Sequence, residues 1–192
     1  MTARRWIAGI AIVAALAGSA VLVASAPDND GITAPFFIRG GLGDTVSGRN
    51  LTAVVTSVEL ADYLDIKYKD AGDTSTDGVW VVVDTVLTAR RDTVIVGDAQ
   101  LWIGDVRYGV SDILPAPTSL QLIYGPDIPQ RGSLVFEIPL DALKDPGASQ
   151  ASIVLYDKVD ARLDSVPVVV VDLTGLDVKP RVRIDERTVV DQ

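Results

Sequence analysis

The stretch Gly78–Arg90 reads GVWVVVDTVLTAR and decides the fold class of this chain. Five Val and two Thr lie within it, no Pro interrupts it, and its one Gly stands at its leading edge. Side chains branched at Cβ have restricted rotamers and pack well on a pleated surface, so the stretch predicts a long strand. Its odd-numbered residues form an almost continuous apolar face, whereas Asp84 and Thr88 interrupt the other face. We therefore expect a central strand, fully buried on one face and partly buried on the other.

Other segments predict further strands separated by turn signals. The pair Gly104-Asp105 is typical of a two-residue hairpin turn. In SLVFEIPL, alternation predicts that Phe136 points inward and that Val135 and Glu137 point outward. Short strands at this spacing indicate an antiparallel β-sandwich. The predicted strands besides Gly78–Arg90 are Asp44–Val46, Leu51–Leu60, Ala99–Ile103, Val106–Val110, Ser133–Leu140, Ala151–Asp157 and Val166–Leu173.

Composition excludes several classes of function. The chain has 192 residues, of which 48% are hydrophobic, so it can bury a sizeable core. A net charge of −9 argues against nucleic acid as a partner, because binding it requires basic charge to neutralise phosphates. Cys and His are both absent. Their absence removes Cys nucleophiles, Ser-His triads, disulfides and zinc sites made of thiolate or imidazole, so we expect no enzyme activity, metal or cofactor.

An uncharged run from Trp6 to Ala26 predicts a single membrane-spanning helix. The run contains 21 residues, and a bilayer core needs about 20. Two Arg precede it and Asp residues follow it, which places the N-terminus in the cytoplasm and the remaining chain outside. The alternative is a signal peptide cleaved after Ala26, since residues 24–26 have the small-x-small form of a cleavage site. The length of the run and the Pro at position 27 favour a retained anchor.

The predicted fold is therefore an Ig-like antiparallel β-sandwich preceded by one N-terminal transmembrane helix. Its expected divisions are a cytoplasmic N-terminus at 1–5, a signal-anchor at 6–26, a spacer at 27–43, the sandwich at 44–175 and a C-terminal tail at 176–192. We expect this tail to be an edge strand or disordered. The protein is predicted to lie in the cell membrane with its folded domain outside the cytoplasm.

Small residues on one face of the anchor are candidates for helix packing. Spacing of this kind allows helices to approach closely in lipid. The alternative is that export segments are simply rich in Ala. The residues concerned are Ala11, Ala15, Gly18 and Ser19.

The segment Ser111–Gly132 is the candidate partner-binding loop. It contains four Pro around the string LQLIYG. Connections longer than about 12–15 residues tend to be functional or disordered, and Pro reduces the entropy lost on binding. The alternative is one more strand over residues 120–124 packed on the core, because LQLIY also alternates. The predicted contact residues are Leu120, Leu122, Ile123, Tyr124 and Pro126.

Clustered carboxylates suggest a calcium loop as an alternative function. Asp70, Asp73 and Asp77 lie in KDAGDTSTDG, and hard cations bind clustered oxygen ligands. Their spacing does not match an EF-hand loop, and Asp with Gly is common in solvated turns. We therefore predict no metal site.

Three strings together resemble a known family. GVWVVVDTVLTA, LWIGDVRYGV and RGSLVFEIP occur in that order. This pattern resembles the immunoglobulin-like domain family of unknown function found in exported bacterial lipoproteins and anchored proteins, kin of the mycobacterial immunoprotective extracellular antigen. The resemblance covers residues 44–173 and implies an Ig-like fold outside the cytoplasm, without catalytic residues to carry over. The chain lacks a lipobox Cys, so anchoring would come from the helix.

These observations predict a non-enzymatic interaction module, such as an accessory subunit of a membrane protein complex. Its expected partner is another membrane protein or a second copy. The alternatives are a small-ligand or calcium-binding domain and a hydrolase that uses carboxylates alone.

Overall fold

A computed structural model of the protein describes residues 14–21, 33–66, 74–96, 98–111, 123–158 and 160–190. The chain divides into two compact units, residues 1–34 and 35–192. In the first unit, residues 14–21 are helical. Within the described ranges, no helix has the length and apolar character needed to cross a membrane. Residues 6–13 and 22–26 of the predicted anchor lie outside these ranges.

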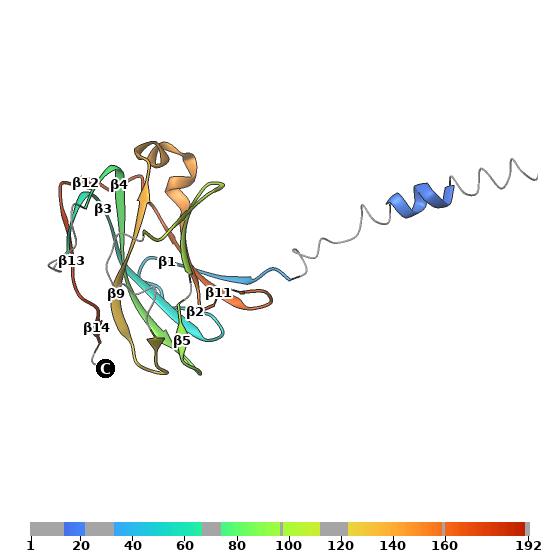
Figure 1. Ribbon diagram of the computed structural model, residues 1–192, viewed down its shortest axis with the longest axis horizontal. Coiled ribbons are helices and arrows are strands. Elements are labelled where there is room, and N and C mark those ends of the chain that lie inside the picture. Colours follow the sequence, from blue (N-terminus) through green and yellow to red (C-terminus); the bar gives the residue numbers. More distant parts are fainter. Residues whose placement is uncertain are drawn as a thin grey trace, which may run out of the picture. The chain divides into compact units, whose positions relative to one another are not determined.

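The second unit is a sandwich of two β-sheets, which confirms the predicted β-sandwich (Figure 1). Sheet A contains β1 (Phe36–Gly41), β6 (Asp98–Ile103), β7 (Val106–Gly109), β10 (Ala151–Tyr156) and β11 (Ser165–Val171). Sheet B contains β2 (Val46–Ser47), β3 (Leu51–Ile66), β4 (Ser75–Ala89), β9 (Gln130–Ile138), β12 (Val178–Lys179), β13 (Val182–Ile184) and β14 (Thr188–Val189). The remaining elements are β5 (Val94–Ile95) and β8 (Ile123–Tyr124), which pair with each other, and two 3₁₀ helices, η2 (Leu140–Lys144) and η3 (Pro146–Gln150).

The strand order shows a mixed topology rather than the antiparallel one predicted. Sheet A runs β1-β11-β10-β6-β7, and sheet B runs β12-β3-β4-β9-β14. Most neighbours are antiparallel, but β1 pairs in parallel with β11. Both β12 and β13 pair in parallel with β3. These parallel pairs join segments far apart in the sequence, where no short hairpin dictates an antiparallel direction.

Strand β4 is central, as its sequence predicts. It pairs with β3 on one edge and with β9 on the other. Its odd-numbered apolar residues belong to the main core between the sheets, together with Phe136 of β9. Close packing requires a glycine at position 78, because a Cβ there would lie 2.3 Å from the Ile138 carbonyl oxygen.

The outer face of sheet B is also buried, where the sequence predicts partial exposure. Trp80 and Val82 are 1% and 3% exposed, and Val135, predicted to point outward, is fully buried. These residues form a second cluster, the outer core, with Val182 and Ile184 of β13. The C-terminal tail pairs with β3 and then with β9, so it covers this face (Figure 1). Residues 178–189 thus supply strands of the domain.

Trp80 fixes the end of the β3–β4 hairpin against the outer core. Its indole Nε1 donates a hydrogen bond to the Thr74 carbonyl oxygen at 2.9 Å. The buried Thr74 hydroxyl in turn donates to the Leu64 carbonyl oxygen. The pairing register shifts between Ala61 and Tyr63, and such irregularities bend a strand. The Leu64 and Thr74 carbonyl oxygens are therefore both satisfied where the regular pairing of β3 with β4 ends.

Strand β1 lies inside the segment predicted to be a spacer. It pairs with β11 over six residues and is followed by a turn in which Asp44 accepts a hydrogen bond from the Gly41 N–H at 2.7 Å. Gly40 allows β1 to pack here, since a Cβ would lie 2.5 Å from Cγ2 of Val46. Gly40 therefore permits close packing at this position.

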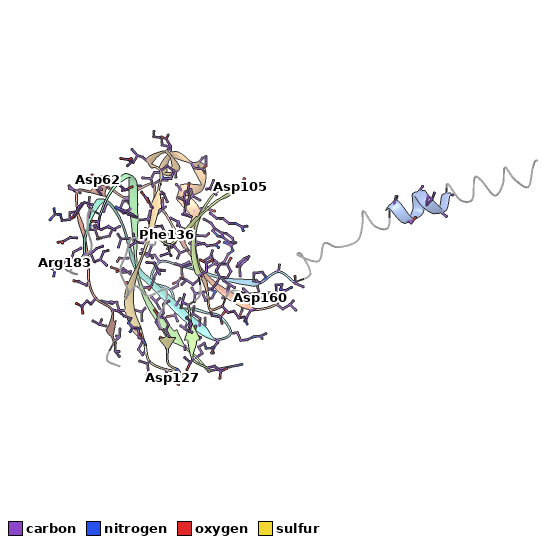
Figure 2. All side chains as sticks on the ribbon, in the orientation of Figure 1. Asp62, Asp105, Asp127, Phe136, Asp160 and Arg183 are labelled. Carbon is purple, nitrogen blue, oxygen red and sulfur yellow. The ribbon has the colours of Figure 1, made fainter. Side chains whose placement is uncertain are left out.

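We expect the tail to contribute measurably to folding. Ile184→Ala should lower the free energy of unfolding by roughly 2 kcal/mol, because it removes a nearly buried side chain from the outer core. That loss corresponds to a decrease in Tm of about 4–8 °C for a domain of this size. The adjacent Arg183→Ala is the control, since Arg183 is exposed on the other side of β13 (Figure 2). Equal melting of both variants in thermal denaturation would show that the tail does not stabilise the domain.

Candidate functional site

The candidate site is a cleft at one end of the sandwich, where three connections meet. These are the β2–β3 turn, the β4–β5 turn and the β10–β11 loop, and the cleft between them measures about 360 Å³. In Figure 2, Asp160 marks the β10–β11 loop, while Asp62 and Asp105 mark the opposite end. Charged and polar side chains dominate its walls, namely Arg49, Asn50, Arg91, Asp92, Thr93, Asp157, Lys158 and Asp164, beside Val94 and Ile95.

Asn50 holds two of these connections together. Its side-chain oxygen accepts hydrogen bonds from the backbone N–H groups of Arg91 at 2.9 Å and Asp92 at 3.0 Å. Its side-chain nitrogen donates to the Asp92 carbonyl oxygen at 3.0 Å. Arg90 adds a hydrogen bond from Nη1 to the Gly48 carbonyl oxygen, also at 3.0 Å. One wall of the cleft is therefore rigid before any ligand binds, which reduces the entropy cost of binding.

Asp164 anchors the opposite wall. Its side chain is 3% exposed and pairs with Arg49 Nε at 3.4 Å and with Lys158 Nζ. It also accepts a hydrogen bond from the Ser165 backbone N–H at 2.8 Å. Burial alone would raise the pKa of Asp164, but the Lys158 hydrogen bond, the Ser165 N–H and the two positive charges together lower it. The hydrogen bond to Asp164 raises the pKa of Lys158. Asp164 is thus held ionised, and its carboxylate is paired with two cations and one backbone N–H.

Asp157 has the opposite environment, although it lies in the same loop. Among the described residues, no group donates a hydrogen bond to its buried Oδ1. Burial, followed by the negative charge of Asp164, raises the pKa of Asp157, and the charge of Lys158, a hydrogen bond from its own backbone N–H and the charge of Arg49 only partly offset this effect. A buried acceptor without a donor is costly and uncommon in folded proteins. Asp157 therefore brings a carboxylate with one unsatisfied oxygen to the wall of the cleft.

The cleft also offers donors and one apolar contact. The Arg49 side chain is 63% exposed despite its ion pair, and Arg91 is exposed. Ile95 is 55% exposed at the rim. A group that carries a hydrogen-bond donor beside an acceptor or a negative charge would match this arrangement. In the part of the chain that the structure describes, no three carboxylates are grouped so that they could hold a metal ion.

The predicted partner-binding loop is only partly described. Leu120 and Leu122 lie outside the described residues. Ile123 and Tyr124 form β8, which pairs with β5. Tyr124 is 1% exposed and belongs to the main core, as expected if this string is a strand. Its side chain is therefore inaccessible to a partner, whereas Pro126 is exposed. Because β5 supplies Val94 and Ile95 to the cleft, this segment supports the site from behind.

Those of the other predicted residues that the structure describes are not among the residues lining the cleft. Ala15, Gly18 and Ser19 are exposed in the helical residues 14–21, and Ala11 lies outside the described residues. The Ser19 hydroxyl donates to the Ala15 carbonyl oxygen at 2.8 Å, within its own helix. Of the acidic loop, Asp70 and Asp73 also lie outside, while Asp77 lines a separate surface hollow with Glu137 and Asp141.

Sequence reasoning missed the cleft, although one signal was present. Residues 157–164 read DKVDARLD, an alternation of acidic and basic residues directly after a predicted strand. Asn50 gives no comparable signal, since a lone Asn after Gly and Arg is ordinary turn composition.

Comparisons with known proteins give only distant similarity. No protein-family model matches the sequence, and none of the curated proteins matches it. Among solved structures, the chain is similar to an uncharacterized β-sandwich protein from Clostridium difficile, with 9% identity over 72% of this chain and 95% of that one and a TM-score of 0.44. It is also similar to MPT63, a secreted protein from Mycobacterium tuberculosis, with 14% identity over 68% and 96% of the two chains and a TM-score of 0.45.

Asp157→Asn tests the environment of the unpaired oxygen. Because the pKa of Asp157 is raised in the folded protein, its ionised form destabilises that state, and stability falls as pH rises through the raised pKa. At pH 7 the Asn variant should therefore be more stable, by about 1 kcal/mol for this partly buried group. The gain should vanish below about pH 3.9, where the carboxyl is protonated in both folded and unfolded states. Melting temperatures measured from pH 3 to 8 provide the readout.

Asp160→Asn is the matched control in the same loop. Hydrogen bonds from Arg162 lower the pKa of Asp160 to about 2, so its ionised form stabilises the folded protein above its unfolded pKa. This variant should gain no stability at pH 7. A destabilised Asp157→Asn protein at pH 7 would contradict the assignment of an unpaired carboxylate.

Proposed function

We propose that this protein is a non-enzymatic, membrane-anchored binding module whose sandwich lies outside the cytoplasm. Its partner, another membrane protein, inserts a hydrogen-bond donor into the cleft and pairs with Asp157. The unpaired buried Oδ1 of Asp157 is the observation that carries the proposal. Leaving such a group unsatisfied costs roughly 1–3 kcal/mol, and a partner that supplies the donor recovers this free energy on binding.

A protein partner suits the dimensions and composition of the cleft. A volume of about 360 Å³ is at the lower end of sites that enclose small molecules. It can instead receive one side chain projecting from a larger surface, while exposed Ile95 and Arg91 contact the area around it. The uncharged run from residue 6 to residue 26 supports a location in the membrane beside such a partner.

A carboxylate-based hydrolase is the second candidate, because opposite pKa shifts in neighbouring carboxylates are typical of acid–base pairs. Asp157 and Asp164 show such opposite shifts. However, Asp164 is occupied by Lys158, Arg49 and the Ser165 N–H. It would have to release these partners to accept a proton from substrate. The absence of Cys and His from the chain also favours binding over catalysis.

Site-specific photo-crosslinking in native membranes tests the proposal. A photoreactive amino acid at Ile95 reports on the cleft, and one at Leu140 reports on the opposite end. The two positions are matched in exposure, at 55% and 53%. We expect the Ile95 probe in the full-length chain to capture one defined membrane protein, which mass spectrometry identifies. The Leu140 probe should not capture it.

Adding Asp157→Ala to the Ile95 probe should reduce that capture about tenfold, as expected for the loss of a buried charged hydrogen bond. Equal capture with and without Asp157 would show that the carboxylate does not bind the partner. Capture of the same proteins from Leu140 would show that the cleft is not the interface. Hydrolytic activity lost in Asp157→Ala would favour the hydrolase instead.

A further inference from the structure

Strand β1 presents an open edge on sheet A. Within the described residues it pairs only with β11, in parallel (Figure 1). The Phe36 N–H donates to the Asp164 carbonyl oxygen at 2.7 Å, which fixes the direction of the alternation. Phe37 and Arg39 therefore direct their backbone N–H and C=O groups away from β11. The next N–H in this series, that of Gly41, is closed by the Asp44 carboxylate. The open edge is thus limited to two residues.

Apolar side chains accompany this edge. Phe36 is 62% exposed and Ile38 is 40% exposed. Natural edge strands are usually protected by Pro, Lys, a bulge or a covering segment. The sequence FFIRGG has no Pro or Lys, and its pairing with β11 is regular over all six residues. Within the described ranges no segment covers this edge, and an edge with exposed apolar residues is suited to pairing with another strand.

We propose that the strand added to this edge is β1 of a second copy of the chain, in antiparallel orientation. Phe37 of each copy lies opposite Arg39 of the other, and the two Ile38 residues lie opposite each other on the two-fold axis. Phe37 and Arg39 then exchange backbone hydrogen bonds across the axis. This register satisfies the open N–H and C=O groups of Phe37 and Arg39 in both copies with four hydrogen bonds.

The side chains are complementary in this register. The Arg39 guanidinium would lie beside the partner's Phe37 ring, a cation–π arrangement that occurs twice by symmetry. The two Ile38 side chains form a non-hydrogen-bonded pair, in which Cα atoms approach to about 4.5 Å. Phe36 lies opposite Gly40 of the other copy, next to the Val46 side chain that fills the space over Gly40.

Shifting the pairing of the two β1 strands in either direction gives a less favourable register. Shifting the pairing so that the two Arg39 residues face each other brings like charges together. It also places Phe37 opposite Gly41, whose N–H is already bound to Asp44. Shifting it in the other direction places Arg39 opposite Pro35, which has no N–H to donate. The side chains and the open backbone groups therefore select a single register.

Disulfide crosslinking of the full-length protein in its own membranes tests this pairing, because the chain contains no native Cys. Ile38→Cys places two thiols opposite each other on the axis and should give a disulfide-linked dimer in high yield on mild oxidation. Ile128→Cys is the control, with a similar exposure of 45% against 40%. It should remain monomeric. No dimer from Ile38→Cys, or equal crosslinking of both variants, would overturn the proposal.

The register has its own test. Oxidising a mixture of Phe37→Cys and Arg39→Cys chains should give the mixed dimer, whereas each variant alone should not crosslink. A homodimer of either variant in comparable yield would contradict the register. Arg39→Pro removes an N–H that points to the open edge but keeps the bonds of β1 to β11. It should therefore reduce native crosslinking through Ile38→Cys by at least tenfold without unfolding the domain, and Arg39→Glu should weaken it through loss of the cation–π contact.

Discussion

Burial of β4 on both faces is the constraint on which the rest of the structure depends. The face that carries Val81 and Val83 packs between the sheets, and the face that carries Trp80 and Val82 requires a separate cover. A tryptophan left in water would expose a large apolar surface and would lose the buried hydrogen bond from its indole to the Thr74 carbonyl oxygen. The tail from β12 to β14 removes this cost, because it crosses from β3 to β9 and places Val182 and Ile184 over the indole. Burial of the outer face of β4 therefore depends on residues 178–189.

Local pattern predicts the interior of this fold well and its edges poorly. β-branched residues and strict alternation make β4 and β9 recognisable, since both signals depend on neighbours one or two residues away. Val135 was assigned to the wrong environment because its cover comes from the tail, far along the sequence. Strand β1 was missed because the fit of Gly40 against Val46 is a tertiary property. The cleft is harder still, because nothing in the sequence distinguishes an unpaired Asp157 from the paired Asp164.

In residues 157–164 of the β10–β11 loop, one carboxylate stabilises the folded domain and another destabilises it. Asp164 is satisfied by two cations and a backbone N–H, so it holds the loop in place. Asp157 is unsatisfied at Oδ1 and destabilises the same loop. Proteins tolerate unsatisfied buried groups mainly where function requires them. The hydrogen bonds of Asn50 and the ion pairs of Asp164 offset this cost locally. The surrounding structure therefore stays folded although Oδ1 of Asp157 has no donor.

Asp164 also connects the cleft to the open edge of sheet A. Its carboxylate forms one wall of the cleft, while its carbonyl oxygen accepts the first hydrogen bond of β1, from Phe36. A change at the cleft that moved this residue would shift the start of β1, and with it the groups that we propose pair with a second copy. The cleft and the start of β1 are coupled through Asp164 because it has partners in both regions. A movement that keeps one set of these contacts would strain or break the other. Asp157 is coupled to Asp164 through its charge, so we expect substitutions at Asp157 to act mainly on the cleft and substitutions at Asp164 to change both regions.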